Sequence, residues 1–157
     1  MRRSRILAVY VFILLLSGCA IFQKKNINSP LEDFYTSSPL PYQTAANRLV
    51  EKARDALNGN NQALAVEHLN KALVIDPYNP FAYFFLSLQT YRNKEFKKSL
   101  GFLSKAQYYT KPFPYWQAQT LHLMSLNATA LSQHQKAKQY AEKAQKLSPN
   151  IDFIDTD

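Results

Sequence analysis

The sequence predicts an all-α protein, and three observations carry that prediction. From Tyr42 onward, apolar and small residues recur at the i, i+3, i+4 and i+7 spacing of amphipathic helices. The 157 residues include only 3 glycines, too few for the many tight turns of a β fold. Prolines and asparagines fall between the periodic segments, where helices are expected to end and begin. The length fits one domain.

Six helices are expected, at residues 43–58, 62–75, 80–93, 95–109, 114–131 and 134–148. Gly59 suits the C′ position after the first helix, and Asn61 can cap the second. Pro77 stops the second helix, whereas Asn79 and Pro80 suit the N-cap and N1 positions of the third.

An internal repeat groups the helices into three units. A shift of 34 residues, followed by a shift of 38, aligns the second helix of each unit; the aligned sets are Ala65/Ser99/Ala137, Leu69/Leu103/Ala141 and Ala72/Ala106/Ala144. The four extra residues of the second shift fall around 111–114. Small residues in the same phase indicate a close approach of helices, where a larger side chain would overpack the crossing at about 1–3 kcal/mol.

A 34-residue helix-turn-helix period is typical of tetratricopeptide (TPR) repeats, and the chain resembles that family over about residues 43–150. The matching segments are Ala65-x3-Leu69-x2-Ala72 with Pro77, Tyr83-x2-Leu86-Ser87, and Leu121-x2-Met124-Ser125-x2-Ala128. The first unit departs from the family at Lys52, which occupies a usual leucine position. The resemblance implies a short right-handed α-solenoid of three TPR-like units.

In this family the first helix of each unit lines a concave groove that binds peptides. By resemblance, the corresponding residues are Asn47, Val50, Arg54, Leu57, Phe81, Phe84, Leu88, Tyr91, Arg92, Gln119, His122, Leu126 and Thr129. The family's best-known groove, a lysine, asparagine and arginine clamp for a terminal carboxylate, is essentially absent here, because only Arg54 among its positions is basic. Aromatic and arginine side chains dominate binding energy, so we expect an apolar or helical partner segment with acidic flanks. The alternative is that Phe81, Phe84 and Tyr91 fill the core between units or hold the tether.

A second aromatic group surrounds the four-residue insertion. Its members are Tyr108, Tyr109, Phe113, Tyr115 and Trp116. Because Trp and Tyr are enriched at interfaces, this group is a candidate second contact. The alternative is that it packs a longer connection between repeats.

The first 18 residues have the features of a secretory signal. Three arginines within the first five residues precede an apolar run at 6–16, and small residues Ser17 and Gly18 follow. The run is too short to span a bilayer, which needs about 20 residues. We therefore expect export.

The segment Leu16-Ser17-Gly18-Cys19 resembles the bacterial lipobox and contains the only cysteine of the chain. The resemblance implies that Cys19 receives a diacylglyceryl group, that cleavage precedes it, and that its new amino terminus is acylated, as by palmitate. Ala20, in place of the aspartate that favours inner-membrane retention, favours the periplasmic face of the outer membrane. The alternative is a free cysteine in an ordinary signal peptide.

The expected organisation is therefore a signal peptide at 1–18, a lipidated tether at 19–42, a TPR-like domain at 43–150 and an acidic tail at 151–157. Prolines resist helix in the tether. The tail, with Asp152, Asp155 and Asp157, is expected to be solvated and disordered.

Little in the sequence suggests catalysis. His68, His122 and His134 lie on different expected helices without metal-ligand spacing, and no nucleophile motif is present. Without a second cysteine the chain forms no internal disulfide. We expect no enzyme activity, no metal and no cofactor other than the covalent lipid on Cys19.

The expected function is that of a lipid-anchored periplasmic adaptor. It would bind a partner protein segment in envelope assembly, cell-wall enzyme regulation, or pilus or secretion assembly. Removal of the signal lowers the formal net charge from +8 to +5. A structural binder of cell wall or anionic lipid through scattered lysines is the alternative; neither nucleic acid nor a small-molecule substrate is expected.

Overall fold

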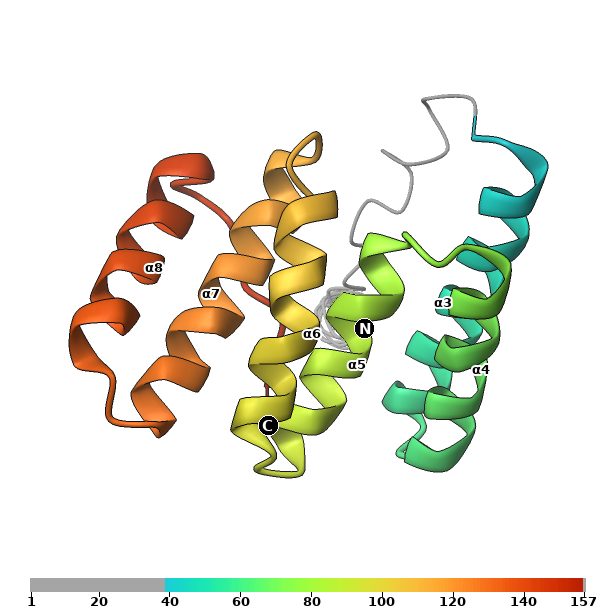
Figure 1. Ribbon diagram of the computed structural model, residues 1–157, viewed down its shortest axis with the longest axis horizontal. Coiled ribbons are helices and arrows are strands. Elements are labelled where there is room, and N and C mark those ends of the chain that lie inside the picture. The colour runs from blue at the N-terminus through green and yellow to red at the C-terminus, as the bar shows by residue number, and fades with distance from the viewer. Residues whose placement is uncertain (1–38, 157) are drawn as a thin grey trace, which may run out of the picture.

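Six helices and no strand make up residues 39–156, which are the residues described by the computed structural model (Figure 1). They are α3 (Pro41–Asn58), α4 (Gln62–Ile75), α5 (Pro80–Arg92), α6 (Phe96–Tyr109), α7 (Pro114–Ala130) and α8 (His134–Leu147). The all-α prediction is confirmed, and each helix boundary lies within two residues of the predicted one. The predicted signal, Cys19 and most of the tether lie outside the described residues.

The helices pack as three antiparallel hairpins, α3–α4, α5–α6 and α7–α8, placed side by side in chain order (Figure 1). Neighbouring hairpins join where α4 contacts α5 and α6 contacts α7, and the first helices also touch, α3 with α5 and α5 with α7. This packing of adjacent helices is consistent with a helical repeat.

The three hairpin turns share one backbone conformation. Asn60, Lys94 and Ser132 have φ angles of 57°, 61° and 59°, and they are 34 and 38 residues apart, the two shifts of the sequence repeat. In each turn this residue donates to the carbonyl three positions earlier and the next residue donates to the carbonyl five positions earlier. Such bonds satisfy carbonyls at a helix end, so the three turns are structurally equivalent.

The prediction that Gly59 occupies the C′ position after the first helix is wrong by one residue. Gly59 has a φ of −83°, whereas the left-handed residue is Asn60, whose short polar side chain tolerates that conformation. The predicted caps are confirmed. The Leu64 amide donates to Asn61 Oδ1 at 3.2 Å, and the Ala82 amide donates to Asn79 Oδ1 at 2.9 Å.

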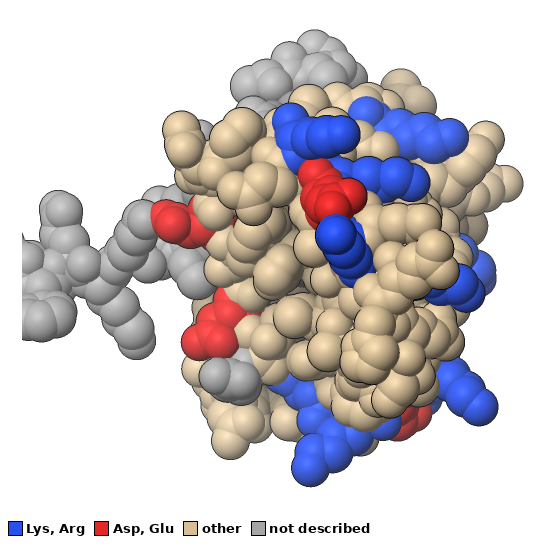
Figure 2. Space-filling view, turned by 90° about the vertical axis from the view of Figure 1, so that its left-hand side faces the viewer, with Lys and Arg blue, Asp and Glu red and all other residues tan. Residues whose placement is uncertain are grey.

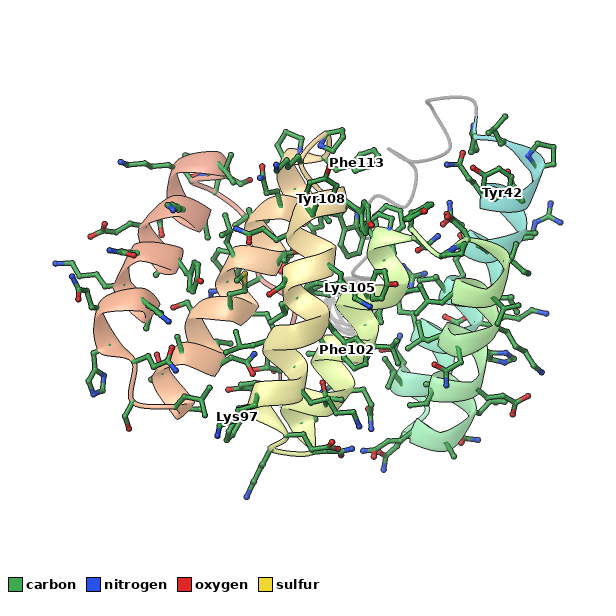
Figure 3. The ribbon with its side chains drawn as sticks, viewed as in Figure 1. Tyr42, Lys97, Phe102, Lys105, Tyr108 and Phe113 are labelled. Atoms are coloured by element: carbon green, nitrogen blue, oxygen red, sulfur yellow. The ribbon has the colours of Figure 1, made fainter. Side chains whose placement is uncertain are left out.

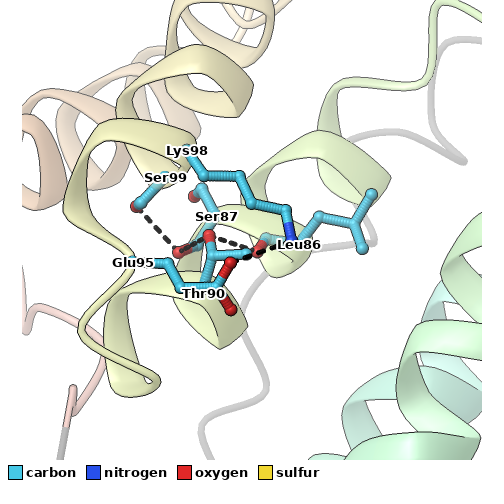
Figure 4. Close-up of polar contacts among 6 residues, drawn as sticks. All are labelled: Leu86, Ser87, Thr90, Glu95, Lys98 and Ser99. Carbon is cyan, nitrogen blue, oxygen red and sulfur yellow. Dashed lines mark hydrogen bonds and ion pairs between the residues drawn. The ribbon is translucent and has the colours of Figure 1, made fainter.

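A hydroxyl group joins the two helices of the second hairpin (Figure 4). Ser99 Oγ on α6 donates to the carbonyl oxygen of Ser87 on α5 at 2.8 Å, and both residues are fully buried. Thr90 Oγ1 donates back to the carbonyls of Leu86 and Ser87 at 2.9 and 3.0 Å. A carbonyl reached by a short side chain requires the two backbones to lie close together.

The third hairpin repeats this contact with its direction reversed. Ser125 Oγ on α7 donates to the carbonyl of Ala137 on α8 at 2.9 Å. These positions are equivalent to those of the second hairpin under the 38-residue shift. The corresponding pair in the first hairpin, Ala53 and Ala65, is fully buried. Small residues therefore occupy the same positions in all three hairpins.

The aromatic core lies between α5 and α7. Trp116 of α7 is fully buried, and its ring lies edge-on to Phe81, Phe84 and Phe85 of α5, with centroid distances of 4.8, 5.4 and 6.0 Å. Edge-to-face pairs contribute about 0.5–1.5 kcal/mol each beyond burial. This cluster therefore fixes the second hairpin against the third.

The segment after α8 turns back toward α7 and α5. The Ile151 amide donates to the Ser148 carbonyl at 3.3 Å, and the chain then runs behind α7 to its end near α5 and α6 (Figure 1). Residues 151–156 form neither helix nor strand. No helix within residues 39–156 is long and apolar enough to cross a membrane.

Candidate peptide-binding groove

The side chain of Gln119 holds the backbone of residues 151–156, which we call the tail segment. Gln119 Nε2 donates to the carbonyl oxygen of Asp152 at 2.9 Å, and the Ile154 amide donates to Gln119 Oε1 at 3.0 Å. These two backbone groups flank Phe153 and point to the same side, as the corresponding groups of an extended strand do. One buried amide therefore pairs with an extended peptide as a neighbouring strand would.

One turn further along α7, His122 contacts the side chain between those two backbone groups. The rings of His122 and Phe153 are stacked, with centroids 3.8 Å apart and planes 14° from parallel. Residues three apart lie on one helix face, so Gln119 and His122 act on adjacent parts of the same segment. Burial lowers the pKa of His122, because desolvation disfavours the charged imidazolium.

The tail segment also reaches the second hairpin. Arg92, the last residue of α5, donates from Nη2 to the carbonyl oxygen of Asp155 at 3.1 Å. Phe153 and Ile154 are partly buried and pack against the core. The expectation of a disordered tail is therefore wrong for residues 151–156, although Asp152 and Asp155 remain exposed.

A pocket of about 640 Å³ opens where the tail segment ends, between the first and second hairpins. It is lined by Leu57, Asn58, Asn60, Gln62, Tyr91, Arg92, Lys94, Phe96, Asp155 and Thr156. Three of these, Leu57, Tyr91 and Arg92, are predicted groove residues. The lining combines apolar side chains with amides and two cations, so the pocket suits a polypeptide better than a purely apolar ligand.

Several other predicted groove residues belong to the interior. Asn47 is fully buried and accepts a hydrogen bond from Asn79 Nδ2 at 2.8 Å, so it serves the contact between α3 and the start of α5. Val50 is fully buried in the core, and Phe81, Phe84 and Leu88 are also buried there. For Asn47 and Val50 a packing role replaces the expected partner contact. The burial of the α5 aromatics agrees with the alternative that they fill the core.

The remaining predicted groove residues either contact the tail segment or lie exposed on their helices. Gln119 and His122 meet the tail segment, and Arg92 meets both the tail segment and the pocket. Arg54 and Leu126 are partly exposed, and Thr129 is exposed at the end of α7. The structure thus gathers Gln119, His122 and Arg92 around one extended segment.

The sequence interpretation missed the tail segment itself. The expectation of a solvated tail rests on Asp152, Asp155 and Asp157 and leaves out the apolar residues of Ile151-Asp152-Phe153-Ile154-Asp155. The signal that could have found the contact is the presence of three large apolar residues among these five. Solvated tails seldom contain such a group, because burial of apolar surface stabilises docking.

The second predicted contact is only partly at the surface. Trp116 is fully buried, so its assignment to a surface contact is wrong; it packs with the α5 phenylalanines instead. Tyr108 is 65% exposed, and Tyr109 and Tyr115 are partly buried. Burial raises the pKa of Tyr115.

Tyr108 and Tyr109 instead join a group of aromatic side chains around α6 that the sequence did not predict; Figure 3 labels Tyr108, Phe102 and Lys105 of this group. Its other members are Tyr78, Tyr83, Phe102, Lys105 and Lys111. Lys105 Nζ lies 5.0 Å from the ring centroid of Tyr83, and Lys111 Nζ lies 4.9 Å from that of Tyr108. Tyr83 and Tyr108 therefore each have a cation within range of attraction.

Lysines and arginines are spread over the α8 end of the molecule, with acidic groups between them (Figure 2). The ion pairs formed by described residues, Lys71–Glu67, Lys98–Glu95 and Lys138–Glu142, each lie within one hairpin and at the surface. Exposed pairs of this kind contribute little to stability.

No group of three or more His, Cys, Asp or Glu side chains between residues 39 and 156 is placed to hold a metal ion. No protein-family model matches the chain, and no curated protein matches it. The arrangement on the α7–α5 face is a backbone clasp by Gln119 beside a stack of the His122 and Phe153 rings.

Proposed function

We propose that this protein is a non-enzymatic, lipid-anchored adaptor that binds an extended segment of a partner protein. The observation that supports the proposal is the docked tail segment, an extended piece of this chain held on the α7–α5 face. Gln119 supplies the backbone contact, His122 the aromatic contact and Arg92 the polar contact at the next hairpin. Together they bind the backbone and one aromatic side chain of an extended polypeptide.

Within this proposal the helical region is a right-handed α-solenoid of three TPR-like units. Support comes from the equivalent turns at Asn60, Lys94 and Ser132 and from the small residues at each hairpin crossing. A stack of this kind presents the first helices of its units along one side. Such a surface suits an elongated ligand.

The anchor is proposed from the sequence at Leu16–Cys19 alone. Export and lipidation of Cys19 would hold the domain at the periplasmic face of the outer membrane through a tether. Two or more acyl chains give stable anchoring. A binding domain on such a tether suits envelope assembly, regulation of a cell-wall enzyme, or assembly of a pilus or secretion machine.

Site-specific photo-crosslinking in intact cells tests the proposal. A photo-reactive residue in place of Tyr91, in the pocket wall, should give a discrete partner adduct identifiable by mass spectrometry. The matched control replaces Val74, which is 82% exposed on α4 away from the pocket lining. Absence of any adduct specific to position 91 would sink the adaptor proposal.

The alternative, a structural binder of cell wall or anionic lipid, draws on the exposed lysines of α8, which are Lys136, Lys138, Lys143 and Lys146. Charge-driven binding weakens as salt rises, so co-sedimentation with purified wall at low and high salt distinguishes the two. Salt-sensitive sedimentation without a crosslinked protein would favour the alternative.

A further inference from the structure

We infer that the tail segment is a built-in competitor for the groove, and that the partner is an extended segment of the same chemistry. That chemistry is an aromatic residue beside an aliphatic one, with acidic residues on both sides. The inference rests on the proposed function and adds the class of ligand and the means by which access to the site is controlled.

The backbone clasp selects an extended partner. Gln119 uses both its donor and its acceptor on backbone groups, at 2.9 and 3.0 Å, and the amide is almost fully buried at 2% exposure. In a helix these backbone groups would already be bonded within the segment. A helical partner therefore leaves Gln119 without its bonds, and a buried amide without partners is unfavourable. The sequence analysis expected an apolar or helical partner segment. The Gln119 contacts favour an extended partner segment instead.

Specificity for an aromatic residue comes from His122. The two backbone groups held by Gln119 bracket Phe153, which places the Phe153 ring over the His122 ring at 3.8 Å. Ile154 follows and packs against the core. An aliphatic side chain in the aromatic position would lose the stacked contact. The site thus favours an aromatic residue followed by an aliphatic one.

The charges around the end of the tail segment favour an acidic partner. Arg92 and Lys94 both line the pocket that Asp155 and Thr156 enter. Arg92 Nε is buried and makes no hydrogen bond with the described residues, so the guanidinium has a donor left for an incoming acceptor. The pocket of about 640 Å³ continues the path toward α3. A longer acidic segment can follow the same path and extend beyond it.

A peptide-exchange assay on the full chain in detergent micelles tests this inference. The probe is a fluorescent peptide with the sequence of residues 149–157, and its binding is measured by fluorescence anisotropy. The Phe153→Ala variant weakens the built-in competitor but keeps the groove. It should bind the probe at least about tenfold more tightly than the wild type, because a larger fraction of molecules has an open site.

Three controls accompany the assay. A probe with alanine in place of its phenylalanine should lose binding to the Phe153→Ala chain. The Phe153→Ala/His122→Ala double variant should lose the gain in affinity, whereas Val74→Ala, on the exposed face of α4, should match the wild type. Far-UV circular dichroism checks that each variant is folded. If Phe153→Ala is poorly folded, exchange is measured on the wild type instead, where excess unlabelled probe should abolish hydrogen-exchange protection of the Ile154 amide.

Equal probe affinity for wild type and Phe153→Ala would overturn the inference, as would Ile154 protection that saturating probe leaves unchanged. A concentration-dependent dimer that Phe153→Ala abolishes would also overturn it, since the tail would then occupy a second copy. Failure of this inference can be distinguished from failure of the adaptor proposal. The anisotropy assay tests the tail on the purified chain, whereas the crosslink at position 91 tests partner binding in cells with the tail unchanged. If the probe does not exchange with the tail segment but position 91 still crosslinks to a partner, the competitor inference is wrong and the adaptor proposal stands.

Discussion

At the scale of single residues, Asn79 performs two tasks that depend on one orientation of its amide. Its Oδ1 caps α5 by accepting from the Ala82 amide at 2.9 Å, and its Nδ2 donates to Asn47 Oδ1 of α3 at 2.8 Å. The residue is fully buried. A cap within one hairpin is thus also a contact with the neighbouring hairpin.

Replacing Asn79 with Ala should lower the free energy of unfolding by about 1–3 kcal/mol, because it removes a cap and leaves Asn47 without its bond. Urea unfolding followed by circular dichroism measures the change. Asn58→Ala, at an exposed position on α3, is the matched control and should stay within about 0.5 kcal/mol of the wild type. An equal loss in both variants would contradict the role assigned to Asn79.

His122 should make docking of the tail segment dependent on pH. Burial holds the pKa of His122 below its usual value of 6.5 when the tail is docked, so the undocked state binds the proton more readily. The stability of docking is therefore fully present above about pH 6.5 and is lost as pH falls through the lowered pKa. Acidification below pH 6.5 should therefore weaken docking of the tail segment.

Nuclear magnetic resonance titration checks this: the Ile154 amide shift should change together with the His122 ring shifts. Replacement of the exposed His134 on α8 should leave the titration unchanged, whereas His122→Gln should abolish it. An Ile154 shift that stays constant between pH 7 and pH 5 would refute the dependence on His122.

At the scale of helices and turns, the spacing of each hairpin depends on one pair of small residues. In the second hairpin Ser99 reaches the Ser87 carbonyl, while the positions equivalent to Ser99 in the other hairpins hold Ala65 and Ala137 (Figure 4). Alanine therefore fits this position without a change in helix spacing. A long side chain does not.

Ser99→Leu should destabilise the domain by about 1–3 kcal/mol beyond the loss from Ser99→Ala, which lacks only the hydroxyl and its bond. Thermal unfolding of the two variants gives the difference directly. Equal melting temperatures for the Leu and Ala variants would mean that the helices do not approach closely at this point.

The helices were predictable because their boundaries are set locally. Asn61 and Asn79 act as caps through bonds to amides three residues ahead, which sequence spacing alone indicates. The left-handed turn residue was less predictable, since Asn60, Lys94 and Ser132 share the conformation but no side-chain type. The bonds that fix it are made by the backbone.

Long-range contacts explain why the groove was predicted only in part. The resemblance to TPR repeats named Gln119, His122 and Arg92, but the residues that they contact in the tail segment lie 31 or more positions away in the chain. Tryptophan is a residue type that is enriched at interfaces, and only the packing of Trp116 against Phe81 and Phe84 shows that it belongs to the core. Helical spacing does not say which neighbour covers an aromatic face.

At the scale of the whole molecule, the chain combines a helical domain with a predicted lipid anchor. The described core extends from α3 to the tail segment, and the predicted anchor at Cys19 lies outside the described residues. We predict that anchoring and folding are separable. This separation gives the anchor its own test.

Cys19→Ala should release the protein from the membrane fraction or leave the signal uncut, while the purified domain keeps its helical circular dichroism and melting temperature. Membrane fractionation and intact mass measure the two effects. Unchanged fractionation together with an unchanged mass would show that Cys19 carries no lipid.

The short link between α8 and the tail segment has a thermodynamic consequence for any competing ligand. Only residues 148–150 separate the end of α8 from Ile151, and flexible links of such length hold a tethered ligand at an effective concentration of about millimolar. A free partner at micromolar abundance must therefore bind about a thousandfold more tightly than the tail segment to occupy the site equally. A partner can make additional contacts in the pocket lined by Arg92, which would contribute to this thousandfold difference in affinity.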